Sequence, residues 1–295
     1  SDSFSQWQNC PIPELILHVS PDGDDESPGS ETEPFQSLPR ARNAIRTYVL
    51  ENGSLPLNGA AVLLHEGDYP LSPTFTLEEQ DSGEPGRPIR YCAFPSRPAR
   101  FSGGIELSGF TPVSDAAILT RLPEKSRGLV YQCDLPAQGV TDLGQLNVRG
   151  MGGSTDPVKP WVDIDANGKA MPLARWPNPG ESELTIGETY RGAFQTSEAN
   201  GPAEFACSHP RFERWREAND IWMDGMWGHL WAAKKIPVER IDIETGRIHA
   251  GAGSGYGVRT GQPLHFINLL EEIDKPGEWY LDRDTGMLYF YPPDE

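Results

Sequence analysis

Long apolar runs are absent from this sequence of 295 residues, and basic residues are few. A helix that spans a bilayer needs roughly 18 consecutive apolar residues, and no stretch approaches that length, which argues against a membrane. Lys and Arg number 25 against 43 Asp and Glu, giving a net charge of −18. Nucleic-acid phosphates require clusters of Lys and Arg, so this balance argues against nucleic acid as a partner. It fits a neutral or soluble sugar substrate without selecting one.

Cysteine is scarce as well: Cys10, Cys92, Cys133 and Cys207 are far apart, and no CxxC pair occurs. Zinc sites commonly use such pairs, so we expect no zinc site. An even number of cysteines permits one or two disulfides in an oxidising compartment, and four free thiols are equally compatible with the sequence. The first residues lack the charged and apolar regions of a signal peptide, so we expect any export signal to have been removed or never present.

Glycine and proline, by contrast, are abundant, with 31 and 28 residues. Because long helical patterns are few, this composition predicts a mostly β, turn-rich protein with one large or two moderate domains. The clearest helix follows Ser37, a candidate N-cap, where Ala41, Ile45 and Val49 share one face. Gly53 supplies its end.

Short strands separated by Gly- and Pro-rich turns follow this helix, and the pattern changes near Gly109. We predict a first domain at 1–109, with a cap helix and the first coils of a right-handed parallel β-helix, and an antiparallel β-sandwich-like domain at 110–295. A short helix is expected at Pro210–Asn219, introduced by Ser208. The expected strands are Leu15–Ser20, Ala60–His65, Phe75–Leu77, Ile89–Ala93 and Ala99–Ser102, then Ala117–Arg121, Leu129–Cys133, Trp161–Ile164, Lys169–Ala174, Pro237–Ile243, Arg247–Ala250, Pro263–Asn268 and Trp279–Tyr291.

Three turns in the second domain have hairpin chemistry. Glu244-Thr245-Gly246 and Asp284-Thr285-Gly286 carry Gly where a left-handed residue is needed. The segment Asp163–Gly168 imitates the start of a calcium-binding EF-hand loop, but Ala174 stands where the bidentate Glu is required. A hairpin turn at Ala166-Asn167-Gly168 is therefore favoured. The loop Asp22–Asp25 offers carboxylates to a structural calcium ion, yet Asp and Gly are also ordinary turn residues, so we expect no cofactor.

Three blocks of sequence resemble a known family. His18–Arg46 looks like the Gly-Asp loop and Ala-rich cap helix that begin many β-helix polysaccharide enzymes, and His65–Gly104 is similar to their first coils. The third block comprises ARWPN (Ala174–Asn178), NDIWMDGMWGHLWA (Asn219–Ala232) and the run Asn268–Pro293, which ends in EWYLDRDTGMLYFYPP. It resembles the sandwich domain inserted between early and later coils in glycoside hydrolase families 120 and 141 and their relatives.

The resemblance implies a portion of a secreted or periplasmic, polysaccharide-degrading glycoside hydrolase. Glycoside hydrolysis needs two carboxylates across the scissile bond. In the resembled enzymes these come from later coils, so we expect them outside this chain and assign no catalytic residue. The rest of the β-helix is expected beyond residue 295, in the same or a second chain, and this portion would form one wall of the sugar-binding cleft.

Aromatic residues supply the first candidates for contact with an oligo- or polysaccharide. Trp227 and Trp231, with Trp222 nearby, could stack on pyranose rings, while His229 and Asp224 could orient hydroxyl groups. The alternative is that the tryptophans fill the sandwich core, since Trp is usually largely buried. In that case His229 is the strongest exception.

Further candidates lie in loops. Arg175 could bind a hydroxyl or a uronate carboxylate at the cleft rim, or stack on Trp176 and fix a domain junction. Tyr256, in the Gly-rich loop Gly251–Gly257, could reach a ligand. The acidic run Glu271–Asp274 could line the cleft, although a solvated turn or a hinge is the simpler interpretation.

Two alternatives to a glycoside hydrolase remain open. A polysaccharide lyase on the same scaffold would need a base and a cation to neutralise a uronate. A non-catalytic carbohydrate-binding or cell-surface module would bind sugar without turnover. A shared fold does not decide between them.

Overall fold

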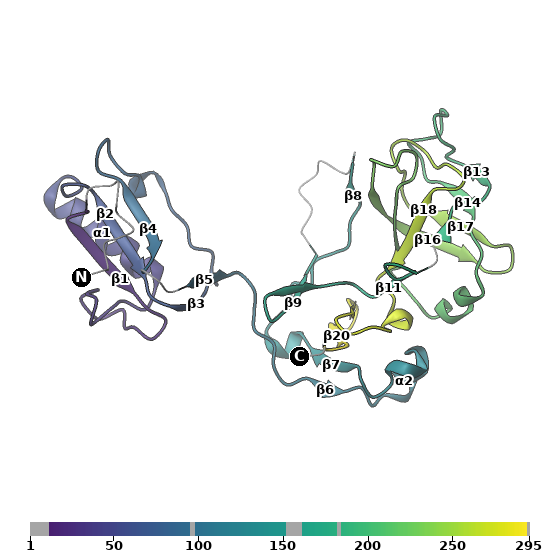
Figure 1. The fold of residues 1–295 in the computed structure, drawn as a ribbon, viewed down its shortest axis with the longest axis horizontal. Coiled ribbons are helices and arrows are strands. Elements are labelled where there is room, and N and C mark those ends of the chain that lie inside the picture. The colour runs from purple at the N-terminus through teal and green to yellow at the C-terminus, as the bar shows by residue number, and fades with distance from the viewer. Residues whose placement is uncertain (1–11, 95–97, 152–160, 182–183, 294–295) are drawn as a thin grey trace. The chain divides into compact units, whose positions relative to one another are not determined.

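The computed structural model describes residues 12–94, 98–151, 161–181 and 184–293 of the chain, and most of its regular structure is β (Figure 1). Its contacts divide the chain into two compact units, Ser1–Glu106 and Leu107–Glu295. Paired strands run parallel in the first unit and antiparallel in the second. Among the described residues, no helix is long and apolar enough to cross a membrane.

The first unit is built on parallel strands that lie in register. β1 (Leu15–Val19) pairs with β2 (Ala60–Leu64), which pairs in turn with β4 (Ile89–Ala93). A second parallel ladder joins β3 (Gly67–Pro70) to β5 (Ala99–Ser102). The predicted strands at β1, β2, β4 and β5 are confirmed, and β3 adds to them.

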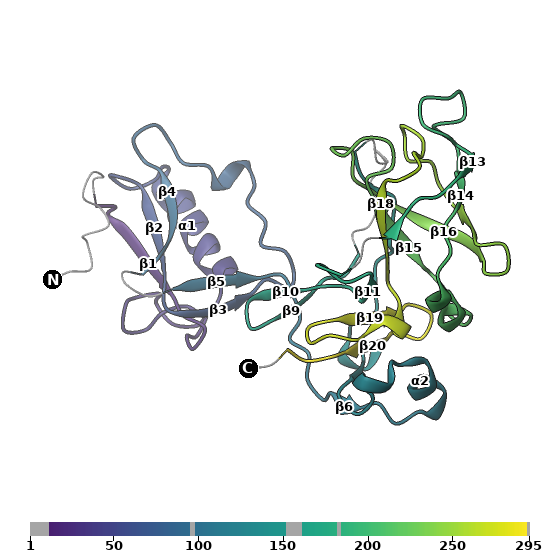
Figure 2. The same cartoon turned by 45° about the vertical axis from the view of Figure 1, so that its right-hand side comes forward.

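Helix α1 (Leu38–Asn52) covers one face of the β1-β2-β4 sheet (Figure 2). Ser37 caps its start by accepting the N–H of Arg40 on Oγ at 3.3 Å. Gly53 ends the helix with φ 79°, a conformation that costs glycine little. Both predicted helix ends are therefore confirmed. The helix buries Leu38, Ala41 and Ile45.

Two segments that the sequence predicts as strands are not strands, and a third, Trp161–Ile164, is strand only at Ile164. Phe75–Leu77 has no regular structure. Ala117–Arg121 belongs to helix α2 (Ala116–Arg121), because the Asp115 carboxylate accepts the N–H of Ala117 at 2.7 Å and caps the helix start. Short apolar runs do not separate a strand from a helix, and here the cap decides.

In the second unit, β19 (Trp279–Asp282) and β20 (Met287–Phe290) form the predicted hairpin, with Gly286 at φ 77° in the turn. β20 also pairs with β7 (Tyr131–Asp134), which pairs with β6 (Thr111–Pro112). The hairpin therefore joins the C-terminal part of the chain to the beginning of this unit.

A large antiparallel sheet forms much of the rest of the second unit. Its strands are β8 (Arg149–Gly150), β11 (Arg175–Trp176), β12 (Leu184–Thr185), β13 (Thr189–Arg191), β14 (Glu204–Ala206), β15 (Trp222–Gly225), β16 (Lys234–Asp242), β17 (Arg247–Ala250) and β18 (Pro263–Ile267). They lie in the order β11-β18-β15-β16-β17-β14-β13, with β12 paired to β18 and β8 paired to β16.

Two other predicted turns are also confirmed. β9 (Ile164–Ala166) and β10 (Lys169–Met171) are joined by Asn167 and Gly168 at φ 53° and 76°, and Gly246 at φ 67° lies between β16 and β17. The helix expected after Ser208 is instead a 3₁₀ helix capped by the side chain of His209. The 3₁₀ helices of the described residues are η2 (Glu79–Asp81), η3 (Glu124–Ser126), η4 (Pro136–Gln138), η5 (Pro210–Trp215) and η6 (Leu270–Glu272).

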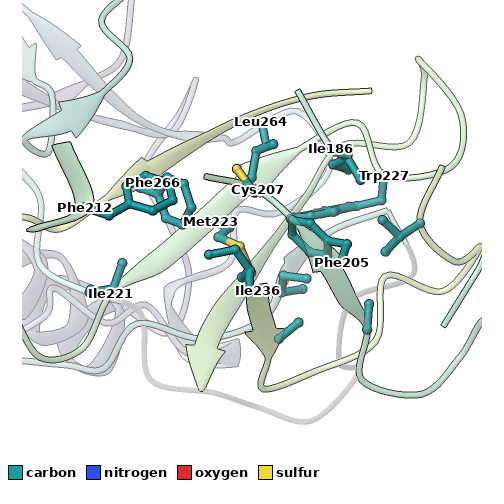
Figure 3. Packing of buried hydrophobic residues seen from close by; sticks show 14 of the residues in the cluster. Ile186, Phe205, Cys207, Phe212, Ile221, Met223, Trp227, Ile236, Leu264 and Phe266 are labelled. Carbon is teal, nitrogen blue, oxygen red and sulfur yellow. The ribbon is translucent and has the colours of Figure 1, made fainter. Parts of the chain in front are cut away.

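The largest apolar core packs η5 and neighbouring segments against one face of the large sheet (Figure 3). Met223, Ile236 and Phe266 from β15, β16 and β18 have no exposed surface. Phe266 lies edge-on to Phe212, with ring centroids 5.4 Å apart. The ring centroids of Phe266 and Trp215 are 5.0 Å apart. Burial of a side chain of this size stabilises the fold by about 2–3 kcal/mol.

We expect Phe266→Ala to lower the free energy of unfolding of the second unit by about 3–5 kcal/mol, because it removes apolar area and leaves a cavity among rigid rings. Leu230→Ala is the control: this side chain is 69% exposed, so the expected loss is below about 0.5 kcal/mol. Urea unfolding followed by tryptophan fluorescence measures both. Equal losses in the two variants would contradict the assignment of the core.

Candidate functional site

One face of the large sheet is apolar and the other carries charge. Successive residues of a strand point to opposite faces. In β15, β16 and β18 the side chains of Met223, Ile236 and Phe266 are buried in the core. The charged or polar residues beside them, which project from the opposite face, are Asp224, Lys235 and His265. Trp222 and Ile267 project from that face as well and form a smaller apolar cluster with Leu146.

The strand register brings these three side chains together. Asp224 stands opposite Lys235 of β16 on one side and His265 of β18 on the other. Lys235 Nζ donates to Asp224 Oδ2 at 2.6 Å, and His265 Nε2 lies 3.8 Å from the same oxygen. The side chain of Lys235 is 31% exposed, that of Asp224 19% and that of His265 22%. A half-buried polar cluster of this kind can bind a ligand because its groups are already partly stripped of water.

Arg175 extends the cluster. It pairs with Ile267, two residues from His265 and therefore on the same face. Its Nε donates to the carbonyl of Pro177 at 3.0 Å. Among the described residues, no carboxylate lies within salt-bridge distance of Arg175. Burial lowers the pKa of its guanidinium, which nevertheless stays charged at neutral pH.

His265 is a neutral member of the cluster. Burial, and secondarily the charge of Arg175, lowers its pKa to about 4. At neutral pH its imidazole can both donate and accept a hydrogen bond. We name Arg175, Asp224, Lys235 and His265 the polar cluster. Two of its members, Arg175 and Asp224, are predicted from sequence as sugar contacts, and the strand pairing adds the other two.

A second group of side chains forms an aromatic cluster. The rings of His229 and Trp231 are stacked, with centroids 4.8 Å apart and planes at 16°. Tyr256 lies edge-on to both, at 5.3 Å from each. Trp231 is 59% exposed and Tyr256 is 37% exposed. Phe194 meets His229 from another side, at 4.9 Å. The structure thus brings together three residues that the sequence marks as sugar contacts.

Trp227 and Trp176 occupy the core instead. Trp227 is 1% exposed, and its indole N–H donates to the carbonyl of Lys234 at 2.7 Å. Trp176 is 7% exposed, and Arg211, rather than Arg175, lies over its ring at 5.6 Å. Arg175 and Trp176 are adjacent in β11 and point to opposite faces, so the expected stacking between them is wrong.

The acidic run after β18 is not a solvated turn, because Glu271 and Glu272 are fully buried. Glu272 accepts hydrogen bonds from the guanidinium of Arg211 at 2.8 and 2.9 Å and from the indole of Trp215 at 2.7 Å. Glu271 pairs with Arg121 of α2 at 2.7 Å. These carboxylates hold elements together, and breaking such a buried pair is strongly destabilising.

The loop considered for calcium is organised by hydrogen bonds. The Asp25 carboxylate accepts the N–H groups of Gln36 and Ser37 at 2.9 and 2.8 Å and the hydroxyl of Ser37 at 2.6 Å. Asp25 thereby ties its loop to the start of α1. Within the described ranges, no group of three or more His, Cys, Asp or Glu side chains could hold a metal ion.

Cysteine contributes no reactive group to either cluster. Cys92, Cys133 and Cys207 are free thiols, and Cys10 lies outside the described residues. Burial raises the pKa of the Cys207 thiol to about 12. A thiol of that kind stays protonated and unreactive.

Comparison with known proteins identifies a fold. No family model matches the chain. No curated protein matches it. A solved structure titled "Glycoside hydrolase" superposes with a TM-score of 0.69, covering 95% of this chain and 43% of that chain at 18% identity. The chain therefore shares its fold with part of a carbohydrate-active enzyme and spans less than half of that protein's length.

Two further solved structures are similar at lower TM-scores. "The complex structure of XylC with xylose" has a TM-score of 0.32 over 91% of this chain and 33% of that chain, at 15% identity. "Rhamnogalacturonan lyase" has a TM-score of 0.21 over 30% of this chain and 21% of that chain, at 25% identity. TM-scores this low do not establish a shared fold.

Glu278, just before β19, makes the stability of the second unit depend on pH. It is 3% exposed, and burial raises its pKa to about 7, although the N–H groups of Asp274 and Lys275 donate to it. The unfolded chain loses this proton near its ordinary pKa. The folded state binds the Glu278 proton more tightly than the unfolded chain does. The stability that this proton contributes is therefore complete below about pH 4.5 and is lost as the pH rises through about 7.

We expect Glu278→Gln to remove this loss, because the amide stays neutral and its oxygen can still accept both N–H groups. At about pH 8 the variant should be more stable than the wild type by about 1–3 kcal/mol, with little difference near pH 4.5. Urea unfolding at both pH values measures this. Glu213→Gln, at a 55% exposed side chain, is the control, and a pH-independent difference for Glu278→Gln would contradict the raised pKa.

Proposed function

We propose that this chain forms a sugar-binding wall in a polysaccharide-degrading glycoside hydrolase. The observation that carries the proposal is the exposed aromatic cluster of His229, Trp231 and Tyr256, on a fold shared with part of a glycoside hydrolase. Aromatic faces stack on the apolar faces of pyranose rings, and neighbouring polar atoms orient the hydroxyl groups.

The geometry of the cluster favours a ligand over an accidental exposure. Trp231 leaves more than half of its surface in water, which costs the fold the burial of a large apolar side chain. Stacking on His229 and edge contact with Tyr256 hold the indole in a defined orientation. A rigid aromatic surface loses little conformational entropy when a sugar binds.

The proposed architecture is the one that the sequence predicts. The parallel ladders β1-β2-β4 and β3-β5 support a first domain, 1–109, that begins a right-handed parallel β-helix capped by α1. The antiparallel sheets support a β-sandwich-like domain at 110–295. The remaining coils would belong to the same or a second chain, and the enzyme would be secreted or periplasmic.

The catalytic carboxylates are proposed to lie outside this chain. Glu271 and Glu272 are committed to arginines, and Asp224 is paired with Lys235 at 2.6 Å. A glycosidase needs one carboxylic acid and one carboxylate placed on either side of the bond that breaks. The described residues instead suit binding and orientation of the substrate.

We expect Trp231→Ala to weaken polysaccharide binding by at least about tenfold, because it removes the exposed stacking surface. Affinity electrophoresis of the whole chain in gels containing xylan, β-glucan, galactan or homogalacturonan measures retardation. Phe101→Ala, a 49% exposed aromatic of the first unit, is the control and should behave as the wild type.

Failure of the wild type to bind any of the four polysaccharides would overturn the proposal. Binding that Trp231→Ala leaves unchanged would remove the aromatic cluster from it. Sugar binding that persists without turnover, when the chain is joined to the rest of its β-helix, would favour a non-catalytic binding module.

A further inference from the structure

The sheet face that carries the polar cluster is positively charged in a strongly acidic protein. Lys235 pairs in register with Arg149 of β8, so Arg149 stands on this face as well. Arg149, Lys235 and Arg175 thus share this face with Asp224. The Arg149 guanidinium lies over the ring of Trp161, 5.3 Å from its centroid, and the Trp161 indole donates to Asp163 at 3.1 Å. The chain as a whole has a net charge of −18. A local excess of cations in such a chain creates a field that concentrates anions.

Arg175 has no carboxylate within salt-bridge distance among the described residues, although Asp224 and Glu278 lie near enough to act on its charge. Its side chain is part-buried, and its one hydrogen bond among the described residues goes from Nε to a carbonyl, that of Pro177. The other nearby carboxylate is Glu278, which is 3% exposed and engaged with two backbone N–H groups. The two terminal amino groups of a guanidinium form a planar fork that matches a carboxylate.

The neighbours of Arg175 suit the rest of an acidic sugar. His265 lies between Arg175 and Asp224 on this face and offers one donor and one acceptor. Lys235 is held by Asp224 at 2.6 Å, in place beside His265. Hydroxyl groups of a pyranose ring need such paired donors and acceptors, while a carboxylate on the ring needs the cation.

We propose that Arg175, with Lys235 and His265, binds the carboxylate of a uronate unit, so that the protein prefers acidic over neutral polysaccharide. The inference rests on the proposed sugar-binding function and specifies its substrate class. The aromatic cluster stacks on sugar rings whatever their charge, and the polar cluster selects the acid. The two contributions are therefore separable by mutation and by ligand chemistry.

The test compares each acidic sugar with an uncharged derivative of the same sugar. Trigalacturonate and xylotriose substituted with glucuronate are each paired with their methyl ester, which keeps the ring and removes the negative charge. In isothermal titration at about 20 mM NaCl, an acid that binds should have a Kd at least about tenfold lower than that of its ester. The preference should shrink at about 300 mM NaCl, because salt screens the attraction.

Arg175→Gln is expected to abolish the preference for the acid while ester binding stays within about twofold. Arg175→Lys should keep part of it, since a point charge remains without the planar fork. Arg216→Gln, at a 60% exposed arginine paired with Glu213, is the control and should keep the full preference. Circular dichroism and urea unfolding establish that each variant is folded.

Asp224→Asn provides an independent test with a gain of binding. It removes the carboxylate that neutralises Lys235, while an amide at this position retains hydrogen-bonding groups. Affinity for the acid should rise by about threefold or more, and affinity for the ester should not. This test does not depend on whether Arg175 tolerates substitution.

The outcomes separate this inference from the proposed function. Equal affinity for acid and ester, unchanged in Arg175→Gln and Asp224→Asn, would overturn the uronate site while sugar binding stands. Loss of ester and acid binding together in Trp231→Ala, with the preference lost only in Arg175→Gln, would support both. Absence of binding to every sugar would overturn both.

Discussion

The pairing of β15 between β16 and β18 is the constraint on which the rest of the second unit depends. It buries Met223 and Phe266 on one face and thereby fixes Asp224 and His265 on the other. A shift of β15 by one residue would place the Asp224 carboxylate in the apolar core and move Met223 out of it. Both changes are costly, so the apolar core determines the position of the polar cluster.

The distribution of ion pairs gives the two acidic regions different roles. Glu271 and Glu272 are fully buried and bound by arginines from α2 and η5, so they connect segments distant in sequence. Asp224 is less buried and has two basic neighbours, Lys235 and His265. Because His265 is neutral, Asp224 offsets the charge of Lys235 alone, and the positive charge left in the polar cluster is that of Arg175. Complete burial beside an arginine is typical of a structural carboxylate, whereas a partly exposed charged group is more typical of a binding site.

Local signals in the sequence predict much of the fold, because Ser37 acts through its own side chain and Gly53 and Gly286 act through their own backbone conformations. The polar cluster could be predicted only in part. Strand β15 reads WMDG, and Asp and Gly disfavour strands, so its pairing depends on β16 and β18. The alternation in PLHFI of β18 is the available signal for His265. The burial of Glu271 has no local signal, since its partner Arg121 is 150 residues away.

The connection between β15 and β16, residues 226–233, links the polar cluster to the aromatic cluster along the chain. Asp224 and Lys235 lie on the strands that this connection joins, and Trp231 lies within it. Trp227 anchors the connection, because its buried indole donates to the carbonyl of Lys234, at the start of β16. Side chains carried by a rigid, anchored segment keep their geometry without a ligand, which lowers the entropy lost on binding. Trp227 lies in this connection and packs in the core, so its burial fixes the position of the exposed residues beside it. Within NDIWMDGMWGHLWA, Trp227 is therefore structural and Trp231 is exposed to solvent.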